Sequence, residues 1–154
     1  MKTLLLSLAL AAPALAQTPE QLVTWDAVVS AAPQPTLSIS AHIQPGWHVY
    51  AQTQGGDGPT PLRISVDANA LAESAGAPTG TVAQKKFDRG FGFETQFYTD
   101  AFTLQIPLRL KSGAATPINQ PIPITLRFQN CSDKECRPPV TLHLSARLAA
   151  QRPT

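Results

Sequence analysis

Apolar and polar residues alternate one by one in four separate runs of the chain. Within residues 37–43, 102–110, 122–128 and 140–146, every second side chain is apolar and most of those between are polar. Successive side chains of a β-strand point to opposite faces, so this period of two predicts strands with one buried face. We therefore predict four strands whose apolar sides share a core.

Shorter apolar runs and frequent turn residues extend this pattern. Further strands are expected at residues 22–29, 47–51, 62–66 and 80–83, and one helical turn at residues 71–74. The fifteen prolines and nine glycines cluster between these runs, as turn residues do in all-β proteins. Seven or eight short antiparallel strands predict an all-β fold, an immunoglobulin-like antiparallel β-sandwich, with a closed barrel as the alternative.

The first sixteen residues carry a different signal. Lys2 precedes an apolar run, and Ala14-Leu15-Ala16 has the small residues of a cleavage site. This pattern predicts a secretory signal peptide over residues 1–16, and an uncleaved anchor is the alternative. Residues 17–154 are then expected to form one domain in the periplasm or another extracytoplasmic compartment.

Charge and composition exclude several classes of function for this chain. The net charge is only +2 and the basic residues are scattered, so neither nucleic acid nor an acidic membrane surface is an expected partner. The single methionine is Met1, which excludes methionine-rich copper chemistry from the mature chain. No Ser/His/Asp or paired-carboxylate arrangement indicates a hydrolase. We expect a monomer without a cofactor or metal.

The two cysteines, Cys131 and Cys136, lie five positions apart in the segment CSDKEC. In an exported protein such a pair is expected to form a disulfide. As a structural staple it would close a small loop, which contributes only about 2 kcal/mol to stability in the chain-entropy model. A metal clip would need further ligands from the scattered His42, His48 and His143, which gives that interpretation little support.

A working redox pair is the third interpretation. The residues between the cysteines are polar, so both sulfurs are expected at the surface. Lys134 and Arg137 carry positive charge that stabilises a thiolate, and Pro138-Pro139 stiffens the following chain. From the residues alone, the structural and the redox interpretations remain about equal.

Three segments in a fixed order carry a resemblance to a known family. They are GWHVYAQTQGGDGPTPLRI (46–64), KFDRGFGFETQFY (86–98) and FQNCSDKECRPP (128–139). Together they resemble the N-terminal periplasmic domain of the thiol:disulfide interchange protein DsbD. The resemblance implies an immunoglobulin-like domain whose surface disulfide passes electrons from a thioredoxin-like donor to oxidised periplasmic proteins.

The resemblance also implies roles for individual residues. Cys136 matches the cysteine that attacks the partner, and Cys131 matches the one that resolves the mixed disulfide. Phe91, with Phe93 close behind, matches an aromatic cap loop over the pair, although both rings could instead pin a loop to the sandwich. His48 and Tyr50 fall where the family places neighbours of the disulfide, and an ordinary cross-strand surface pair is the alternative for them.

Two departures from the family pattern shape the expected function. Arg89-Gly90 stands where the family has an acidic pair, and up to Thr154 we find no membrane or Cys-x-x-Cys segment, so we expect the electron donor to be a separate protein. We therefore expect an exported thiol–disulfide interchange module with protein-disulfide reductase activity. Thioredoxin-fold proteins and a separate membrane electron carrier are its expected partners. The alternative is a non-catalytic envelope adaptor in which the disulfide is only structural.

Overall fold

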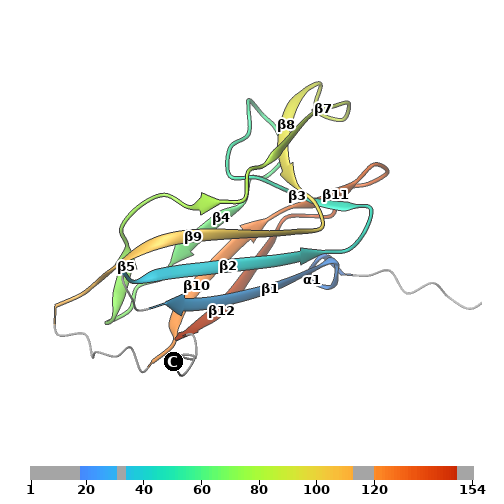
Figure 1. The fold of residues 1–154 in the computed structure, drawn as a ribbon. Coiled ribbons are helices and arrows are strands. Elements are labelled where there is room, and N and C mark those ends of the chain that lie inside the picture. The colour runs from blue at the N-terminus through green and yellow to red at the C-terminus, as the bar shows by residue number, and fades with distance from the viewer. Residues whose placement is uncertain (1–17, 31–33, 113–119, 149–154) are drawn as a thin grey trace, which may run out of the picture.

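The computed structural model of the chain describes residues 18–30, 34–112 and 120–148. The predicted signal peptide, residues 1–16, lies outside this part. Nearly all of the regular structure in the described ranges is β (Figure 1). The elements are α1 (Pro19–Leu22), β1 (Val23–Ser30), β2 (Thr36–Ile43), β3 (Trp47–Tyr50), β4 (Arg63–Val66), β5 (Ala72–Ser74), β6 (Thr79–Gly80), β7 (Gln84–Asp88), β8 (Phe93–Tyr98), β9 (Ala101–Leu110), β10 (Ile122–Phe128), β11 (Asn130–Ser132) and β12 (Val140–Leu148).

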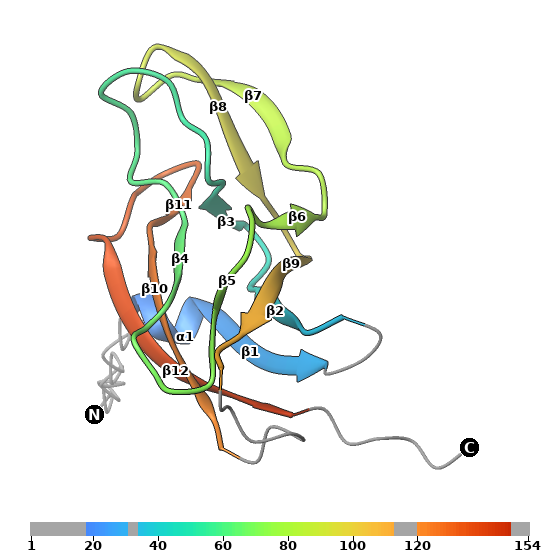
Figure 2. The same cartoon turned by 90° about the vertical axis from the view of Figure 1, so that its left-hand side faces the viewer.

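The larger sheet forms both layers of the sandwich. Its strands follow the order β4-β10-β12-β1-β2-β9-β5, and β6 pairs with β9. All pairs are antiparallel except β1 with β12, which run parallel. Figure 2 shows β4, β10 and β12 on one side of the molecule and β2 and β9 on the other. This confirms the predicted all-β, immunoglobulin-like sandwich.

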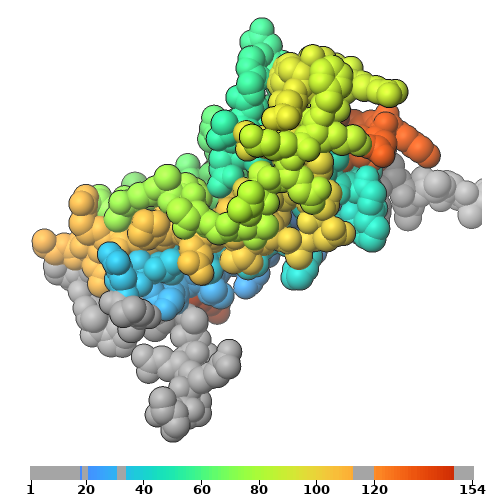
Figure 3. All heavy atoms as spheres, turned by 45° about the horizontal axis from the view of Figure 1, so that its top comes forward, coloured from blue at the N-terminus to red at the C-terminus, as the bar shows by residue number. Residues whose placement is uncertain are grey.

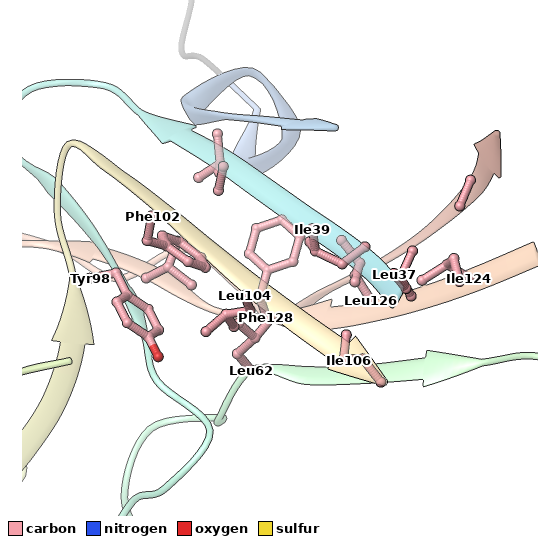
Figure 4. Packing of buried hydrophobic residues seen from close by; sticks show 14 of the residues in the cluster. Leu37, Ile39, Leu62, Tyr98, Phe102, Leu104, Ile106, Ile124, Leu126 and Phe128 are labelled. Carbon is pink, nitrogen blue, oxygen red and sulfur yellow. The ribbon is translucent and has the colours of Figure 1, made fainter. Parts of the chain in front are cut away.

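The core lies between these two layers. Its side chains are the apolar members of the alternating runs, and most of them are fully buried. Figure 4 shows side chains from β2 and β9 packed against those of β10; the labelled ones include Leu37, Ile39, Leu104, Ile106, Ile124, Leu126 and Phe128. Burying such a side chain contributes roughly 1.5–3 kcal/mol. The four strongly alternating strands are therefore located correctly by their period of two.

A second, four-stranded sheet stands at one end of the sandwich (Figure 1). Its order is β11-β3-β8-β7, and β7 and β8 form a hairpin that projects from the molecule. The sequence did not predict β7, β8 or β11. Their residues show no regular alternation, and the burial pattern of β7 is almost wholly exposed. This small sheet therefore connects β11, the strand that carries Cys131, to the β7–β8 hairpin through β3.

Two of the predicted short elements differ in the structure. The helical turn expected at residues 71–74 is wrong, because Ala72–Ser74 forms β5, an edge strand that pairs with β9. The Asn69 side chain accepts hydrogen bonds from the Leu71 and Ala72 amides, which turns the chain onto that edge. The strand expected at residues 80–83 is reduced to the two-residue β6, Thr79–Gly80. No helix in the described ranges is long and apolar enough to cross a membrane.

Candidate functional site

The cysteine loop is a tight hairpin closed by a disulfide between Cys131 and Cys136. Cys131 lies in the middle of β11, and backbone hydrogen bonds close the loop on both sides of the bridge. The Ser132 amide donates to the Glu135 carbonyl at 2.8 Å, and the Arg137 amide donates to the Asn130 carbonyl at 2.9 Å. The loop that presents the disulfide is therefore ordered by its own backbone.

The two cysteines differ sharply in exposure. Cys131 is only 1% exposed, whereas Cys136 is exposed on the loop. The expectation that both sulfurs lie at the surface is therefore wrong for Cys131. The reason is that β11 pairs with β3, which draws Cys131 into the small sheet opposite His48. Solvent therefore reaches this disulfide from the Cys136 side.

Aromatic rings of β3 and β8 cluster on the small sheet beside β11, the strand that carries Cys131. His48 is the register partner of Cys131, and side chains paired in this way project from the same face of a sheet. The His48 ring lies 5.0 Å from the Tyr50 ring and 5.1 Å from the Phe97 ring, measured between centroids. The structure thus brings both predicted neighbours, His48 and Tyr50, to the cysteine loop.

The hairpin turn between β7 and β8 is shaped by Asp88. One oxygen of its carboxylate accepts a hydrogen bond from the Gly90 amide at 2.8 Å, and the other accepts one from the Tyr50 hydroxyl at 2.8 Å. The Asp88 carbonyl also accepts a bond from the Gly92 amide, and Gly92 has a φ of +78°, which favours glycine. Asp88 therefore forms the turn and fastens it to β3.

Burial and charge set the protonation of the two polar rings. Burial lowers the pKa of His48 below its ordinary value, an effect opposed by the carboxylates of Asp88 and Asp133 and reinforced by Lys86. Burial, together with the hydrogen bond to Asp88, raises the pKa of Tyr50 above its ordinary range. At neutral pH the site therefore holds an uncharged imidazole and a hydroxyl that donates.

The structure places Phe91 and Phe93 differently. Phe91 lines the same cleft as Cys136, and its ring meets the Tyr50 ring edge-on at 6.0 Å. Phe93 packs instead on the loop of residues 55–58, here called the glycine loop, where a Cβ added to Gly58 would lie 2.7 Å from its ring. The rings remain neighbours at 6.2 Å. Phe91 is therefore the ring at the cleft, and Phe93, paired with Asp88 next to the turn, anchors the tip of the hairpin.

A cleft of about 1010 Å³ lies between the hairpin and the cysteine loop. In Figure 3 the hairpin, in yellow-green, rises beside the cysteine loop, in orange. Lys86 on β7 and Asp133 in the loop form an ion pair at 3.7 Å across this space, and both side chains are exposed. Arg137 is held over the Trp47 ring at 5.5 Å and beside Glu135 at 3.2 Å.

Asp88 and the Lys86–Asp133 pair were not singled out as site residues from the sequence. For Asp88 a signal existed, because an Asp two residues before a Gly is typical of a turn made by the aspartate side chain. For Lys86 and Asp133 there was none, since they are far apart in the chain and meet only through the small sheet. Among the described residues, no group of His, Cys, Asp or Glu is arranged to hold a metal ion.

Comparison with known proteins agrees with this geometry. A sequence model of the family "Thiol:disulfide interchange protein DsbD, N-terminal" matches residues 16–146. The reduced N-terminal domain of DsbD from Neisseria meningitidis is similar, with a TM-score of 0.55 and 20% identity over 84% of this chain and 87% of that one. No curated protein matches the chain.

A second solved structure shares the fold. It is the N-terminal periplasmic domain of ScsB from Proteus mirabilis, with a TM-score of 0.52 and 18% identity over 84% of this chain and 49% of that one. The disulfide lies within the residues that the family model matches, and this combination supports a role in thiol–disulfide exchange. With well over half of its length matched, the chain belongs to the family of the N-terminal domain of the thiol:disulfide interchange protein DsbD.

Proposed function

We propose that this domain is an extracytoplasmic electron carrier that exchanges the Cys131–Cys136 disulfide with thioredoxin-fold proteins. In its reduced form it reduces oxidised proteins of the periplasm, and a separate membrane electron carrier restores it. The signal peptide predicted over residues 1–16 and the periplasmic domain named among the similar structures support this location. Family membership supports the chemistry.

The observation that carries the proposal is the unequal exposure of the two cysteines. Exchange proceeds by in-line attack of one thiolate on one sulfur, so a carrier needs one cysteine that partners can reach and one that they cannot. Cys136 is exposed beside the cleft, whereas Cys131 is 1% exposed behind it. A disulfide that served stability alone would not need an open cleft over one of its sulfurs.

The chemical steps conserve electrons and protons. The Cys136 thiolate attacks a disulfide of the partner, forms a mixed disulfide and releases one partner thiolate, which takes up a proton. The Cys131 thiolate then attacks the Cys136 sulfur, restores the internal disulfide and releases the second partner thiolate. Two electrons pass to the partner, and the domain ends oxidised. Reduction by the donor is the same sequence in reverse.

The hairpin supports control of access to this site. Phe91 lines the cleft next to Cys136, and the turn that carries it is fastened to β3 through Asp88 and Tyr50. We propose that the hairpin covers the disulfide between encounters and moves aside when a partner docks. Phe93, next to the turn and packed on the glycine loop, holds the hairpin in its covering position until a partner docks.

A trapping experiment tests the proposed function. The Cys131→Ser variant, reduced and mixed with a bacterial thioredoxin that keeps only its exposed active-site cysteine, activated as the mixed disulfide with thionitrobenzoate, should accumulate a covalent complex that dithiothreitol dissolves. The matched Cys136→Ser variant should give none or only traces, because its remaining cysteine is buried. Equal amounts of complex from both variants, or none from either, would contradict the assignment of Cys136 as the attacking residue.

A further inference from the structure

We propose that the His48 imidazole accepts the proton of Cys131 when that cysteine resolves the mixed disulfide, and returns it when Cys131 is the leaving group. The proposal rests on the exchange function described above and adds to it the residue that takes up and returns the Cys131 proton. It concerns only the second step, the attack of Cys131 on Cys136, and therefore makes a prediction that the first step does not share.

The second step needs help that the first does not. Only a thiolate attacks a disulfide, and ionising a thiol in buried surroundings is unfavourable because the charge loses its solvation. Cys136 is exposed and can release its proton to water. Cys131 is 1% exposed, so water has little access to its sulfur. A base must therefore lie next to Cys131 within the protein.

His48 occupies that position. Cys131 and His48 are directly opposite in the β11–β3 ladder, and their Cβ atoms are expected to be about 4.5–5.5 Å apart on one face of the sheet. Tyr50 and Phe97 contact the imidazole ring and hold it in place, with centroids 5.0 and 5.1 Å away. His48 also lines the cleft, so a proton that it accepts can leave to solvent.

The other polar group beside the pair does not fit this task. The Tyr50 hydroxyl donates its hydrogen to Asp88, and burial raises its pKa, so it does not take a proton from a thiol. His48 is uncharged at neutral pH because burial lowers its pKa, which leaves a ring nitrogen free to act as an acceptor. Geometry and protonation state therefore agree on His48.

The charges that face His48 favour a transient imidazolium. Asp88 from the β7 end of the hairpin and Asp133 from the cysteine loop act on the ring as negative charges, and Lys86 from β7 opposes them. The β8 and β3 neighbours, Phe97 and Tyr50, are uncharged. When Cys131 transfers its proton, the new thiolate and imidazolium form an ion pair, and the two carboxylates stabilise its imidazolium member.

The proton balance closes over the cycle. In the oxidising direction the Cys131 proton moves to His48, the thiolate bonds to the Cys136 sulfur, and the sulfur bond from Cys136 to the partner breaks. His48 then releases the proton to the departing partner thiolate or to water. In the reverse direction the donor thiol loses its proton, directly or through water, to His48. Its thiolate attacks Cys136, and the resulting imidazolium protonates Cys131 as it leaves.

The two steps can be separated with 5,5′-dithiobis(2-nitrobenzoate) as the probe. One equivalent added to the reduced domain should release thionitrobenzoate in two phases. The first phase reports attack by Cys136, and the second reports resolution by Cys131. In His48→Phe, which keeps a ring between Tyr50 and Phe97, the second phase should slow at least tenfold at pH 7 while the first stays within twofold. His48→Gln should do the same.

The pH dependence distinguishes a proton acceptor from a packing residue. The wild-type second phase should slow as the pH falls through the pKa of His48, which burial holds below the ordinary imidazole value of about 6.5. In His48→Phe this inflection should vanish, and the rate should follow hydroxide concentration. A control variant, His42→Gln on β2 of the other sheet, should keep the wild-type second phase at pH 7. The proposal is overturned if both His48 variants keep the wild-type second phase and its pH profile.

This outcome is separable from failure of the exchange function. If the cysteine pair were only structural, Cys131→Ser would form no complex with thioredoxin, whatever His48 does to the second phase. If His48 were only a packing residue, the thioredoxin complex would still form, and the second phase would be insensitive to His48→Phe. The two experiments therefore fail independently.

Discussion

The Tyr50 hydroxyl donates a 2.8 Å hydrogen bond to the Asp88 carboxylate, and this bond joins the strand beside the disulfide to the hairpin that carries Phe91. The same carboxylate accepts the Gly90 amide and so shapes the hairpin turn. One aspartate thus links the conformation of the turn to its position over the cleft. Loosening this link should expose the disulfide without disturbing the sandwich core.

Tyr50→Phe tests the link directly. The variant loses the bond to Asp88, and we expect a loss of about 0.5–1.5 kcal/mol in unfolding free energy and a several-fold faster reduction of the disulfide by dithiothreitol. Tyr98→Phe is the matched control, because the Tyr98 hydroxyl donates an equal 2.8 Å bond to Gln52 away from the disulfide. It should lose similar stability with an unchanged reduction rate. Equal rate increases in both variants would refute the link.

The two phenylalanines of the hairpin should behave differently. Phe91→Ala removes the ring that lines the cleft, so we expect at least tenfold faster reduction by dithiothreitol with little change in stability. Phe93→Ala removes a ring packed on the glycine loop, so it should lower the unfolding free energy by several kcal/mol and raise the reduction rate less. Urea unfolding and stopped-flow reduction measure the two effects. Faster reduction in Phe93→Ala than in Phe91→Ala would show that the roles are reversed.

The glycine loop gives a steric test of how the hairpin is anchored. A Cβ on Gly58 would lie 2.7 Å from the Phe93 ring and 2.9 Å from the Gly55 carbonyl oxygen, so Gly58→Ala must displace one of them. We expect it to destabilise the domain by about 1–3 kcal/mol. At Gly55 the nearest Phe93 atoms would be 3.9 Å away, an ordinary contact, so Gly55→Ala should have a much smaller effect. Indistinguishable urea midpoints for the two variants would contradict this packing.

The lowered pKa of His48 predicts an acid-sensitive stability. The unfolded chain takes up a proton near the ordinary value of 6.5, whereas folded His48 resists protonation because it is buried. Between these two pKa values the unfolded state binds more protons, so the unfolding free energy falls as the pH falls. The contribution of His48 is complete above pH 6.5 and is lost below it. His48→Gln should therefore lose less stability than the wild type between pH 7.5 and pH 5 in urea titrations. Parallel losses would exclude the effect.

Much of the fold is predictable from the sequence because period-two alternation reports directly on burial. The strand of residues 122–128 is located to the residue, since every second side chain enters the core. The segment at residues 71–74 is not, because its conformation comes from pairing with β9 and from the Asn69 side chain. Local sequence carries no information about that distant edge.

The functional site, like the fold, has features that the sequence predicts and features that depend on distant strand pairing. The sequence identifies Cys131 and Cys136 as a pair, but the polar residues between them predict exposure for both. The burial of Cys131 results from pairing with β3, which lies more than eighty residues earlier in the chain. The hairpin escaped prediction because β7 is mostly exposed and neither strand shows a regular alternation of apolar and polar residues. Only the family resemblance drew attention to Phe91.

The central claim is that Cys131–Cys136 is a working redox pair, and its reduction potential tests this most directly. The oxidised domain would be equilibrated with graded dithiothreitol buffers, and the free thiols counted by maleimide alkylation. We predict a potential above about −300 mV, in the range where thioredoxin-fold proteins exchange electrons. A potential below about −300 mV, where structural disulfides of secreted proteins lie, would contradict the account.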